Sequence, residues 1–290
     1  MRNQLNIWVV GGDMRQVKLA EALADDGHGV HTFALEQSGE ELPGRQENGL
    51  DGVALADCVV LPLPVEGEGG LLNAPLSHRP HPLPEVLDAL QPGQIVCAGR
   101  VTDGVRALAE ERGLTIHDYF AREELAVANA VPTAEGALQI AMEELPVTLH
   151  GARVLVLGYG RVGRATAGRF AALGARVSVA ARKYADLAWA EAAGHGVEHI
   201  GELSGWLCGY DLLVNTVPAR VLGEKELAEL RKGCLVIDLA SRPGGVDFEA
   251  AAQLGVKAIW ALSLPGKVAP VTSGRYIRDT IYNILRELGV

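Results

Sequence analysis

Short apolar runs alternate along this chain with stretches in which apolar residues recur at helical spacing. In the first half, the patterns predict strands near 5–10, 29–34, 58–61, 94–98 and 114–117, and helices near 14–25, 84–90 and 103–112. In the second half, they predict strands near 153–157, 176–181, 196–200, 211–215, 234–239 and 257–260, and helices near 161–173, 184–193, 224–231 and 247–253. Strands that alternate with helices are typical of a mostly parallel sheet with crossover helices, so we expect an α/β protein. The segments 36–57 and 62–84 fit neither pattern and are predicted to be loops.

The length of the chain favours two domains, because 290 residues are about twice the ~150 residues of a typical domain. We expect two doubly wound, Rossmann-like domains with parallel sheets and a cleft between them. Residues 1–130 are predicted to form an N-terminal domain that binds substrate or a partner, and residues 131–272 a nucleotide-binding domain. The second domain is predicted to include a linker helix at 133–144 that starts after Pro132. The C-terminal helix, near 273–290, is long enough to join the first domain.

The charge balance excludes several classes of partner. The chain has 26 Lys and Arg residues against 36 Asp and Glu residues, a formal net charge of −10. Such a chain is poorly suited to nucleic acid or an anionic membrane as its main partner. Its first apolar run is too short for a signal sequence or a membrane span, and its four cysteines include no C-x-x-C pair. We therefore expect a cytoplasmic protein.

A glycine-rich sequence follows the strand predicted at 153–157 and opens the next helix. It reads Gly158-Tyr159-Gly160-Arg161-Val162-Gly163. In a dinucleotide site, the first glycine permits a tight turn, the second lets the backbone approach a pyrophosphate, and the third lets the helix pack close to the strand. The amides at the start of the helix then face the phosphates. A glycine-rich turn without a ligand is the alternative.

The end of the next strand bears on which nucleotide is bound. The strand predicted at 176–181 is followed by Arg182 and Lys183. An NAD site usually has Asp or Glu near this point, where a carboxylate binds the ribose 2′-hydroxyl. Arg182 is instead suited to hold a 2′-phosphate through charge-assisted hydrogen bonds, with Lys183 as a second positive charge. NADP is therefore the favoured cofactor and NAD the alternative, while two solvated side chains without a ligand are a further interpretation.

A second glycine turn, Gly11-Gly12, follows the first predicted strand and precedes Asp13, Arg15 and Gln16. Gln16 stands where a dinucleotide site has its third glycine, and Asp13 places negative charge where a phosphate would lie, so no second nucleotide site is expected. Arg15 and the amides of the turn are suited to a substrate carboxylate. A helix cap by Asp13 followed by a surface arginine is the alternative.

Polar residues mixed with proline and glycine follow three strands of the second half. Ligands of doubly wound sheets bind beyond the carboxyl ends of the strands, so these turns are predicted to surround the nicotinamide end of the cofactor. They are Asn215-Thr216-Val217-Pro218, Ala240–Phe248 and Ser263–Gly274. We expect the first of them to contact the cofactor.

The chain as a whole resembles the A subunits of dipicolinate synthases. The matching elements, in order along nearly the whole chain, are Gly11-Gly12-Asp13-x-Arg15-Gln16, Pro132-Thr133-x-Glu135-Gly136, Gly158-x-Gly160-Arg161-x-Gly163, Asn215-Thr216-x-Pro218, Asp238-Leu239-Ala240-Ser241-Arg242-Pro243-Gly244-Gly245-x-Asp247-Phe248 and Leu264-Pro265-Gly266-x-Val268-Ala269-Pro270-x-Thr272-x-Gly274. The run that starts at Asp238 is the most specific, and residues 36–85 match least well.

This resemblance implies an NAD(P)-dependent oxidation of dihydrodipicolinate, made from hydroxytetrahydrodipicolinate of the lysine pathway, to dipicolinate during sporulation. It also implies a flavoprotein-like B subunit as partner and the mother cell of a sporulating bacterium as location; the chain is also compatible with a homo-oligomer. A dicarboxylate substrate needs cationic and hydroxyl partners, which Arg15, Thr133, Arg242 and Thr272 supply. Lys267 has the charge to bind an anion, although the resemblance does not cover its position.

For proton transfer, Glu135 is the first candidate, because it is expected in the first turn of the linker helix, where burial would raise its pKa. Asp13 is the second candidate, and the hydroxyl of Thr133 is grouped with them. The alternative for Glu135 is a first-turn carboxylate that complements the helix dipole.

No metal site is expected. His195 and His199 are four residues apart, but Gly196 interrupts any helix between them. The tryptophans are predicted to fill the core or an interface; they are Trp8, Trp189, Trp206 and Trp260.

Two other functions are compatible with the same residues. One is an NADP oxidoreductase of the shikimate- or alanine-dehydrogenase type that acts on another small carboxylate. The other is a nucleotide-binding subunit whose partner carries out catalysis, because a binding motif does not by itself establish turnover.

Overall fold

The structure is a computed structural model that describes residues 4–290 and divides the chain into two compact units. The first unit contains the described residues up to Ala128 together with Ala269–Val290, and the second contains Asn129–Val268. Residues 1–3 of the predicted N-terminal domain lie outside the described residues.

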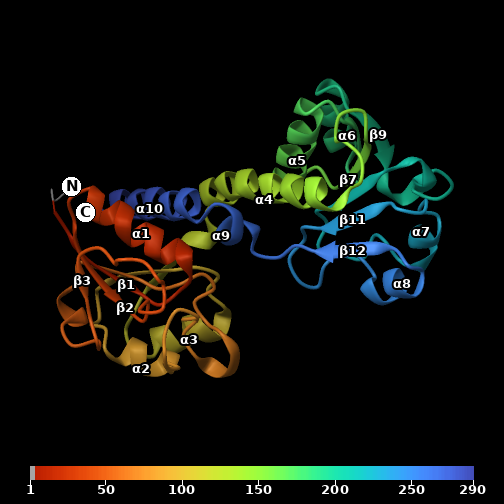
Figure 1. The fold of residues 1–290 in the computed structure, drawn as a ribbon. Helices are drawn as coiled ribbons and strands as arrows, with labels where there is room; N and C mark the ends of the chain where they lie inside the picture. The colour runs from red at the N-terminus through yellow and green to blue at the C-terminus, as the bar shows by residue number, and fades with distance from the viewer. Residues whose placement is uncertain (1–3) are drawn as a thin grey trace. The chain divides into compact units, whose positions relative to one another are not determined.

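The first unit is built on a six-stranded parallel sheet with the strand order β3-β2-β1-β4-β5-β6. The strands are β1 (Asn6–Val10), β2 (Gly29–Phe33), β3 (Arg45–Gln46), β4 (Cys58–Val60), β5 (Ile95–Ala98) and β6 (Ile116–Asp118). One face is covered by α1 (Met14–Asp25) and α10 (Pro270–Glu287), and the other by α2 (Leu83–Asp88) and α3 (Asp103–Glu110) (Figure 1). The strand order reverses direction between β1 and β4, which is the point where doubly wound sheets bind ligands.

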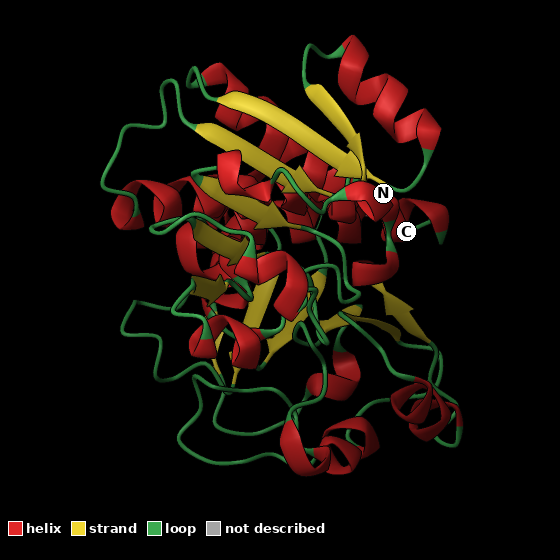
Figure 2. Ribbon diagram, turned by 90° about the vertical axis from the view of Figure 1, so that its right-hand side faces the viewer, coloured by secondary structure: helices red, strands yellow, loops and turns green. Residues whose placement is uncertain are grey.

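The second unit repeats this plan with a six-stranded parallel sheet of the order β12-β11-β10-β7-β8-β9. Its strands are β7 (Arg153–Leu157), β8 (Arg176–Ala181), β9 (Gly196–His199), β10 (Leu212–Asn215), β11 (Leu235–Asp238) and β12 (Lys257–Trp260). Helices α5 (Arg161–Ala172) and α6 (Tyr184–Ala192) cover one face, and α7 (Glu224–Ala228) and α8 (Phe248–Gln253) the other (Figure 1). Figure 2 shows the strands in yellow and the helices that flank them in red. The reversal lies between β7 and β10.

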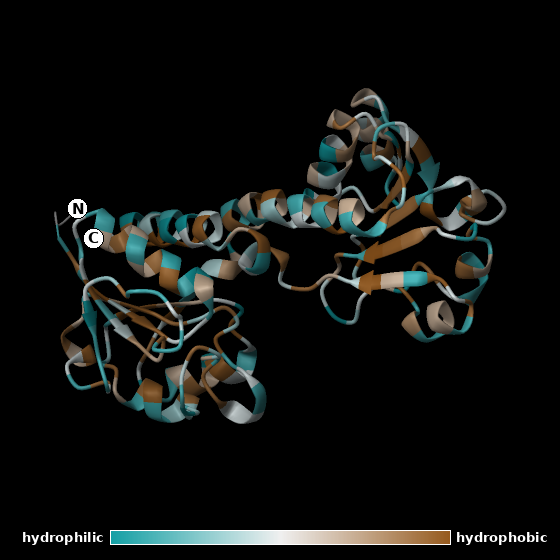
Figure 3. Ribbon diagram, in the orientation of Figure 1, coloured by the Kyte–Doolittle hydropathy of each residue, from teal (hydrophilic) through white to brown (hydrophobic). Residues whose placement is uncertain are grey.

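Two further helices complete the chain, α4 (Glu123–Glu144) and α9 (Leu264–Val268). Short 3-10 helices lie in the connections: Val53–Leu55, Glu68–Gly70, Tyr119–Ala121, Ile200–Glu202 and Leu207–Gly209. Most residues of the central strands are apolar because helices cover both faces of each sheet, and the hydropathy colouring shows these strands largely in brown (Figure 3).

Helix α10 belongs to the first unit because it packs tightly on α1. A Cβ placed on Gly274 would lie 2.7 Å from the amide nitrogen of Leu19 and 2.9 Å from the carbonyl oxygen of Arg15. Only glycine allows this approach of the two backbones. Thr272, two residues earlier, is half-buried in the first turn of the same helix.

The predicted α/β class and the parallel, doubly wound sheets are confirmed, and the bounds of α1, β7, β8 and β12 agree with the prediction to within a residue or so. The segment 36–57 contains the two-residue strand β3, which is too short to give a sequence signal. Trp8 is buried as predicted, whereas Trp189 is 64% exposed and does not lie in the core.

The predicted start of the linker helix is wrong. Helix α4 begins at Glu123, ten residues earlier than the predicted residue 133, and contains Pro132. Proline removes one backbone hydrogen bond but does not prevent a helix whose apolar residues are buried on both sides of it, here Leu125 and Ala134. The predicted last turn, Ser263–Gly274, is also wrong in part, because α9 and the start of α10 occupy most of it.

Candidate functional site

The glycine turn after β7 lies at the strand reversal of the second sheet. The amide of Gly158 donates to the carbonyl oxygen of Ala180 at 2.8 Å, which fixes the turn beside the end of β8. Gly158 has a φ of +92°, and a Cβ there would lie 2.5 Å from Oγ1 of Thr216. Both conformation and space therefore require glycine at this position.

The other two glycines of the turn differ in what surrounds them. A Cβ on Gly163 would lie 2.2 Å from the carbonyl oxygen of Gly158, so packing within the protein excludes any side chain. A Cβ on Gly160 would meet no protein atom within 4 Å. Gly160 is also the N-cap of α5 and provides no side-chain hydrogen bond to the helix amides. The open space above Gly160 and the uncapped amides fit a pyrophosphate.

The end of β8 carries exposed positive charge. Arg182 and Lys183 follow Ala181 directly, both are exposed, and Lys183 is the N-cap of α6. The sequence has no carboxylate between Arg176 and Asp186. The acidic residue typical of an NAD site is therefore missing from this point.

Asn215, at the end of β10, is fully buried rather than presented to a ligand. Its Nδ2 donates to Oδ1 of Asp238 at 2.7 Å and to the carbonyl oxygen of Val217 at 3.0 Å, and its Oδ1 accepts from the Val217 amide at 3.1 Å. Thr216 donates from Oγ1 to the carbonyl oxygen of Leu157 at 2.8 Å. The side chains of this turn thus shape it, while Pro218 is exposed.

Asp238 organises the turn after β11, a role that its position in the sequence did not suggest. Its carboxylate is fully buried and accepts from the amides of Ala240 at 3.0 Å and Gly245 at 2.8 Å, besides Asn215. A carboxylate at the end of an apolar strand is costly to bury unless it is fully hydrogen-bonded. The sequence signal that would have identified Asp238 is therefore an acidic residue at the end of an otherwise apolar strand.

Arg242 lies in the turn that Asp238 holds. Its side chain is exposed, and its guanidinium carbon is 5.9 Å from the ring centroid of Trp260. Trp260 in turn donates from Nε1 to the carbonyl oxygen of Ala240 at 2.9 Å and stacks on Phe248. Arg242 is therefore an exposed cation on a turn that hydrogen bonds to Asp238 and from Trp260 hold in place. Lys267 is also exposed, on α9.

The expected surroundings of Glu135 are wrong. It lies in the middle of α4 rather than in a first turn, its side chain is 56% exposed, and its Oε1 is 3.5 Å from Nε of Arg169. The burial that the sequence led us to expect is therefore absent. Thr133, half-buried, donates from Oγ1 to the carbonyl oxygen of Asn129 at 2.7 Å. A Cβ on Gly136 would lie 3.0 Å from Leu264, so this glycine allows α4 to approach α9.

At the glycine turn of the first unit, Gly11-Gly12, the side chains of Asp13 and Arg15 bind each other. Asp13 caps α1, because its Oδ1 accepts from the Arg15 amide at 3.0 Å, as the alternative interpretation held. The guanidinium of Arg15 binds the same carboxylate, with Nη2 2.7 Å from Oδ2, and donates to the carbonyl oxygen of Leu63 at 2.7 Å. The surface position of Arg15 in that interpretation is wrong: only 11% of its side chain is exposed, because the segment after β4 covers it.

The Asp13–Arg15 pair is a fixed ion pair. Burial would lower the pKa of the Arg15 guanidinium, but the hydrogen bonds and the charge of Asp13 outweigh it and raise that pKa above its ordinary value. Arg15 is therefore always charged, and Asp13 neutralises it. The pair ties the turn after β1 to the segment after β4, at the strand reversal of this sheet.

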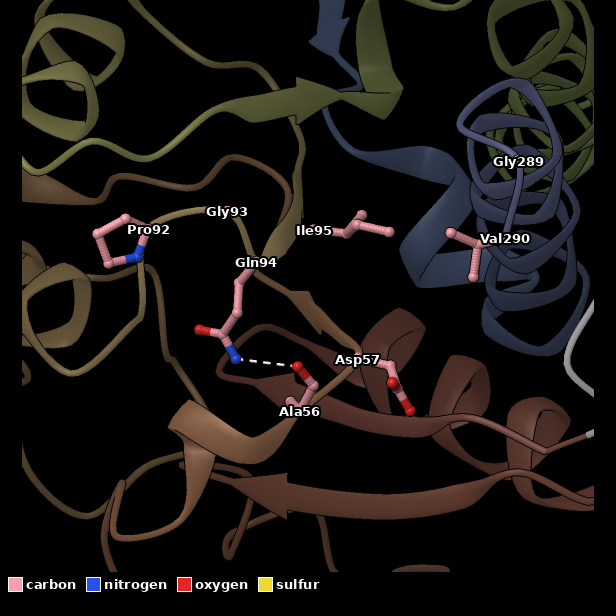
Figure 4. Close-up of a pocket in the computed structure, with 8 residues that line it drawn as sticks. All are labelled: Ala56, Asp57, Pro92, Gly93, Gln94, Ile95, Gly289 and Val290. Carbon is pink, nitrogen blue, oxygen red and sulfur yellow. Dashed lines mark hydrogen bonds between the residues drawn. The ribbon is translucent and has the colours of Figure 1, made fainter.

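A cavity of about 530 Å³ also lies in the first unit (Figure 4). It is lined by residues that precede β4 and β5, among them Asp57 and Gln94, and by Val290. Gln94 is held there by a hydrogen bond from Nε2 to the carbonyl oxygen of Ala56 at 3.0 Å. The cavity therefore lies at the amino ends of the strands, the opposite edge from the glycine turn, and ligands of such sheets bind at the carboxyl ends.

Among residues 4–290, no group of three or more His, Cys, Asp or Glu side chains is arranged to hold a metal ion. No helix in this part of the chain is long and apolar enough to cross a membrane.

Two family models match the chain. Residues 6–120 match the N-terminal domain of the A subunit of dipicolinate synthase, and residues 121–254 match the NAD-binding domain of D-isomer specific 2-hydroxyacid dehydrogenases. The second unit therefore contains a nicotinamide-nucleotide-binding domain of the dehydrogenase type.

Comparisons with individual proteins agree with the two family models. The A subunit of dipicolinate synthase from Bacillus subtilis (strain 168) is 32% identical over 291 residues, which cover 99% of this chain and 98% of that protein. The crystal structure of the A subunit from Bacillus halodurans has a TM-score of 0.88 at 33% identity and covers 96% of this chain and 97% of that one. A transhydrogenase from Sinorhizobium meliloti, with a TM-score of 0.73 at 17% identity over 97% of this chain and 94% of its own, shares the fold.

Proposed function

Because the chain belongs to the family of dipicolinate synthase A subunits, we propose that it oxidises dihydrodipicolinate to dipicolinate with a nicotinamide nucleotide as the electron acceptor. The observation that carries the proposal is the contrast within the glycine turn. Packing accounts for Gly158 and Gly163 but not for Gly160, whose open position suits a ligand that approaches the backbone.

The proposed nucleotide is NADP. The hydrogen bond from Gly158 to Ala180 places the glycine turn beside the end of β8, two residues before Arg182. Arg182 and Lys183 are exposed there and supply the positive charge that a 2′-phosphate needs. When bound, the nicotinamide ring supplies a hydride acceptor. Oxidation of the substrate then releases one hydride and one proton, and the product is the aromatic dicarboxylate.

The residues that we assign to the substrate are charged or hydroxyl side chains in each unit. In the first unit, Arg15 and Thr272 are the proposed carboxylate ligands, with Asp13 as the second candidate for the proton. The Asp13 carboxylate already accepts several hydrogen bonds from Arg15, so part of its hydrogen-bonding capacity is used within the protein.

In the second unit, Arg242 and Lys267 are the proposed cations for the substrate, and Thr133 is the proposed hydroxyl. Glu135 remains the first candidate for the proton, because its exposed carboxylate is held only by a long contact from Arg169 to Oε1. Aromatisation provides much of the driving force, so positioning of the substrate contributes more than a strong base.

We propose that the partner is a flavoprotein-like B subunit, since the relatives are named as one subunit of a synthase. The proposed location is the cytoplasm of the mother cell of a sporulating bacterium.

The test is an assay of the purified full chain with freshly generated dihydrodipicolinate and NADP or NAD, with and without the B subunit. We expect reduced nicotinamide and dipicolinate to appear in equal amounts, faster with NADP. Reduced nicotinamide that appears only with the partner assigns catalysis to the complex. No dipicolinate under either condition would refute the proposed reaction.

The choice of NADP is tested with Arg182→Asp, which should shift the preference toward NAD by about 10-fold or more, because a carboxylate repels the 2′-phosphate and accepts from a 2′-hydroxyl. The matched control is Arg176→Asp, an exposed arginine at the other end of the same strand. Equal NADP to NAD ratios in both variants would rule out the assignment of Arg182.

A further inference from the structure

Arg164 contacts both the backbone and a side chain of the glycine turn. It follows Gly163 on α5, and its Nε donates to the carbonyl oxygen of Tyr159 at 3.0 Å. Its guanidinium carbon also lies 5.2 Å from the ring centroid of Tyr159. Tyr159 is the residue between the first two glycines, so Arg164 fixes the part of the turn where a pyrophosphate would lie.

The same guanidinium contacts α6. Its Nη2 lies 3.4 Å from Oδ1 of Asp186, and its central carbon lies 6.0 Å from the ring centroid of Trp189. Helix α6 begins directly after Arg182 and Lys183. Arg164 therefore joins the turn proposed for the pyrophosphate to the helix that starts at the residues proposed for the 2′-phosphate. We refer to Tyr159, Arg164, Asp186 and Trp189 as the Arg164 clasp.

The contacts of the Arg164 clasp are not explained by packing in the hydrophobic core, because the side chains of Arg164 and Trp189 are exposed. The side chain of Arg164 is 49% exposed, and Trp189 is 64% exposed. A large aromatic side chain in solvent contributes little to the core, and an exposed ion pair stabilises a fold by only about 0–1 kcal/mol. These contacts instead join α5 and α6, the helices that begin at the glycine turn and directly after Arg182 and Lys183.

The charges of the clasp also bear on the cofactor. Asp186 is the one carboxylate between Arg176 and Ala190 in the sequence, and it lies in the first turn of α6. An unpaired carboxylate at this point would repel the 2′-phosphate of NADP but not the 2′-hydroxyl of NAD. Its partner is Arg164.

We propose that Arg164 is a positioning residue for NADP, which fixes the glycine turn against α6 and neutralises Asp186 beside the 2′-phosphate site. The inference rests on the proposed function, because it assumes that NADP binds at this turn. It implies two separable effects. The link to Tyr159 supports the binding of either nucleotide, and the neutralisation of Asp186 supports NADP alone.

The test compares the wild-type chain with Arg164→Met, which keeps an apolar side chain of similar length but loses the charge and the N–H donors. Dissociation constants for NADP and NAD are measured by calorimetry on the full chain. We expect the constant for NAD to rise about 10-fold, as one lost hydrogen bond in the turn implies, and that for NADP to rise about 3-fold more. The control is Arg176→Met, which should change neither constant.

Two further variants separate the effects. Adding Asp186→Asn to Arg164→Met should restore the wild-type ratio of the two dissociation constants but not their magnitude. The second substitution removes the repulsion of the 2′-phosphate, but it does not restore the hydrogen bond from Arg164 to Tyr159. Arg164→Lys keeps the charge and loses the planar donor group, so it should weaken both nucleotides while the ratio stays close to that of the wild type.

The outcomes distinguish this inference from the proposed function. Unchanged constants in Arg164→Met, with normal NADP binding by the wild type, overturn the clasp and leave the proposed function intact. A wild-type chain that binds neither nucleotide overturns both. If Arg164→Met loses affinity equally for the two nucleotides, and Asp186→Asn does not alter that loss of affinity, the role of Asp186 is overturned.

Discussion

The carbonyl oxygen of Gly158 lies so close to Gly163 that a Cβ on Gly163 would approach it to 2.2 Å. The turn and the first turn of α5 are therefore in direct contact, and no side chain fits between them. Replacing Gly163 with alanine should force the turn and the helix apart.

We expect Gly163→Ala to lower the free energy of unfolding by about 1–3 kcal/mol, as for other overpacked sites, and to weaken nucleotide binding at the same time. Urea denaturation and calorimetry measure the two effects. The control is Gly168→Ala on the same helix, where a Cβ meets nothing within 4 Å. The free energy of unfolding of Gly168→Ala should rise by up to about 1 kcal/mol, since alanine favours the helix more than glycine does. Equal stabilities of the two variants would contradict the close contact.

Gly160→Leu should separate folding from binding. The added Cβ would meet no protein atom within 4 Å, so the thermal midpoint should stay close to that of the wild type. The side chain would occupy the position proposed for the pyrophosphate, so binding of both nucleotides and activity should be lost together. Retained nucleotide binding in a folded Gly160→Leu variant would remove the assignment of this turn as the nucleotide site.

Asp238→Ala should be among the more destabilising single substitutions in the second unit. It leaves the amides of Ala240 and Gly245 and the side chain of Asn215 without their common acceptor. We expect a loss of about 3 kcal/mol or more in the free energy of unfolding, measured by chemical denaturation. Glu249→Gln, an exposed carboxylate on α8, is the control and should change stability by less than about 0.5 kcal/mol.

Stability should fall as the pH is lowered below neutrality. Burial lowers the pKa of His195 below its ordinary value, so at mildly acidic pH the unfolded chain binds more protons than the folded one. The free energy of unfolding should therefore be highest above the unfolded pKa of about 6.5 and fall as the pH drops below it.

His195→Phe tests this contribution, because phenylalanine keeps a ring against Tyr159 and does not titrate. The difference in unfolding free energy between neutral and mildly acidic solution should be smaller in this variant than in the wild type. The same pH dependence in both proteins would show that His195 does not contribute.

The sequence located most elements because their signals are local. Asp13 marks the start of α1 and Arg153–Leu157 forms a buried strand, and in both cases a few neighbouring residues suffice. The start of α4 was missed because Pro132 is a strong local signal for a helix start, while the helix is maintained by burial of residues on both sides of it.

The sequence by itself determined the doubly wound class, the glycine turn and the absence of an acidic residue at the end of β8, since each depends on residue types and short spacings. Only the tertiary structure decided that Arg15 donates to the carbonyl oxygen of Leu63, that Asn215 faces the buried Asp238, and that Glu135 is exposed. Those outcomes depend on which segments distant in the sequence pack together. Burial and pairing are properties of that packing, and no local pattern of residues records them.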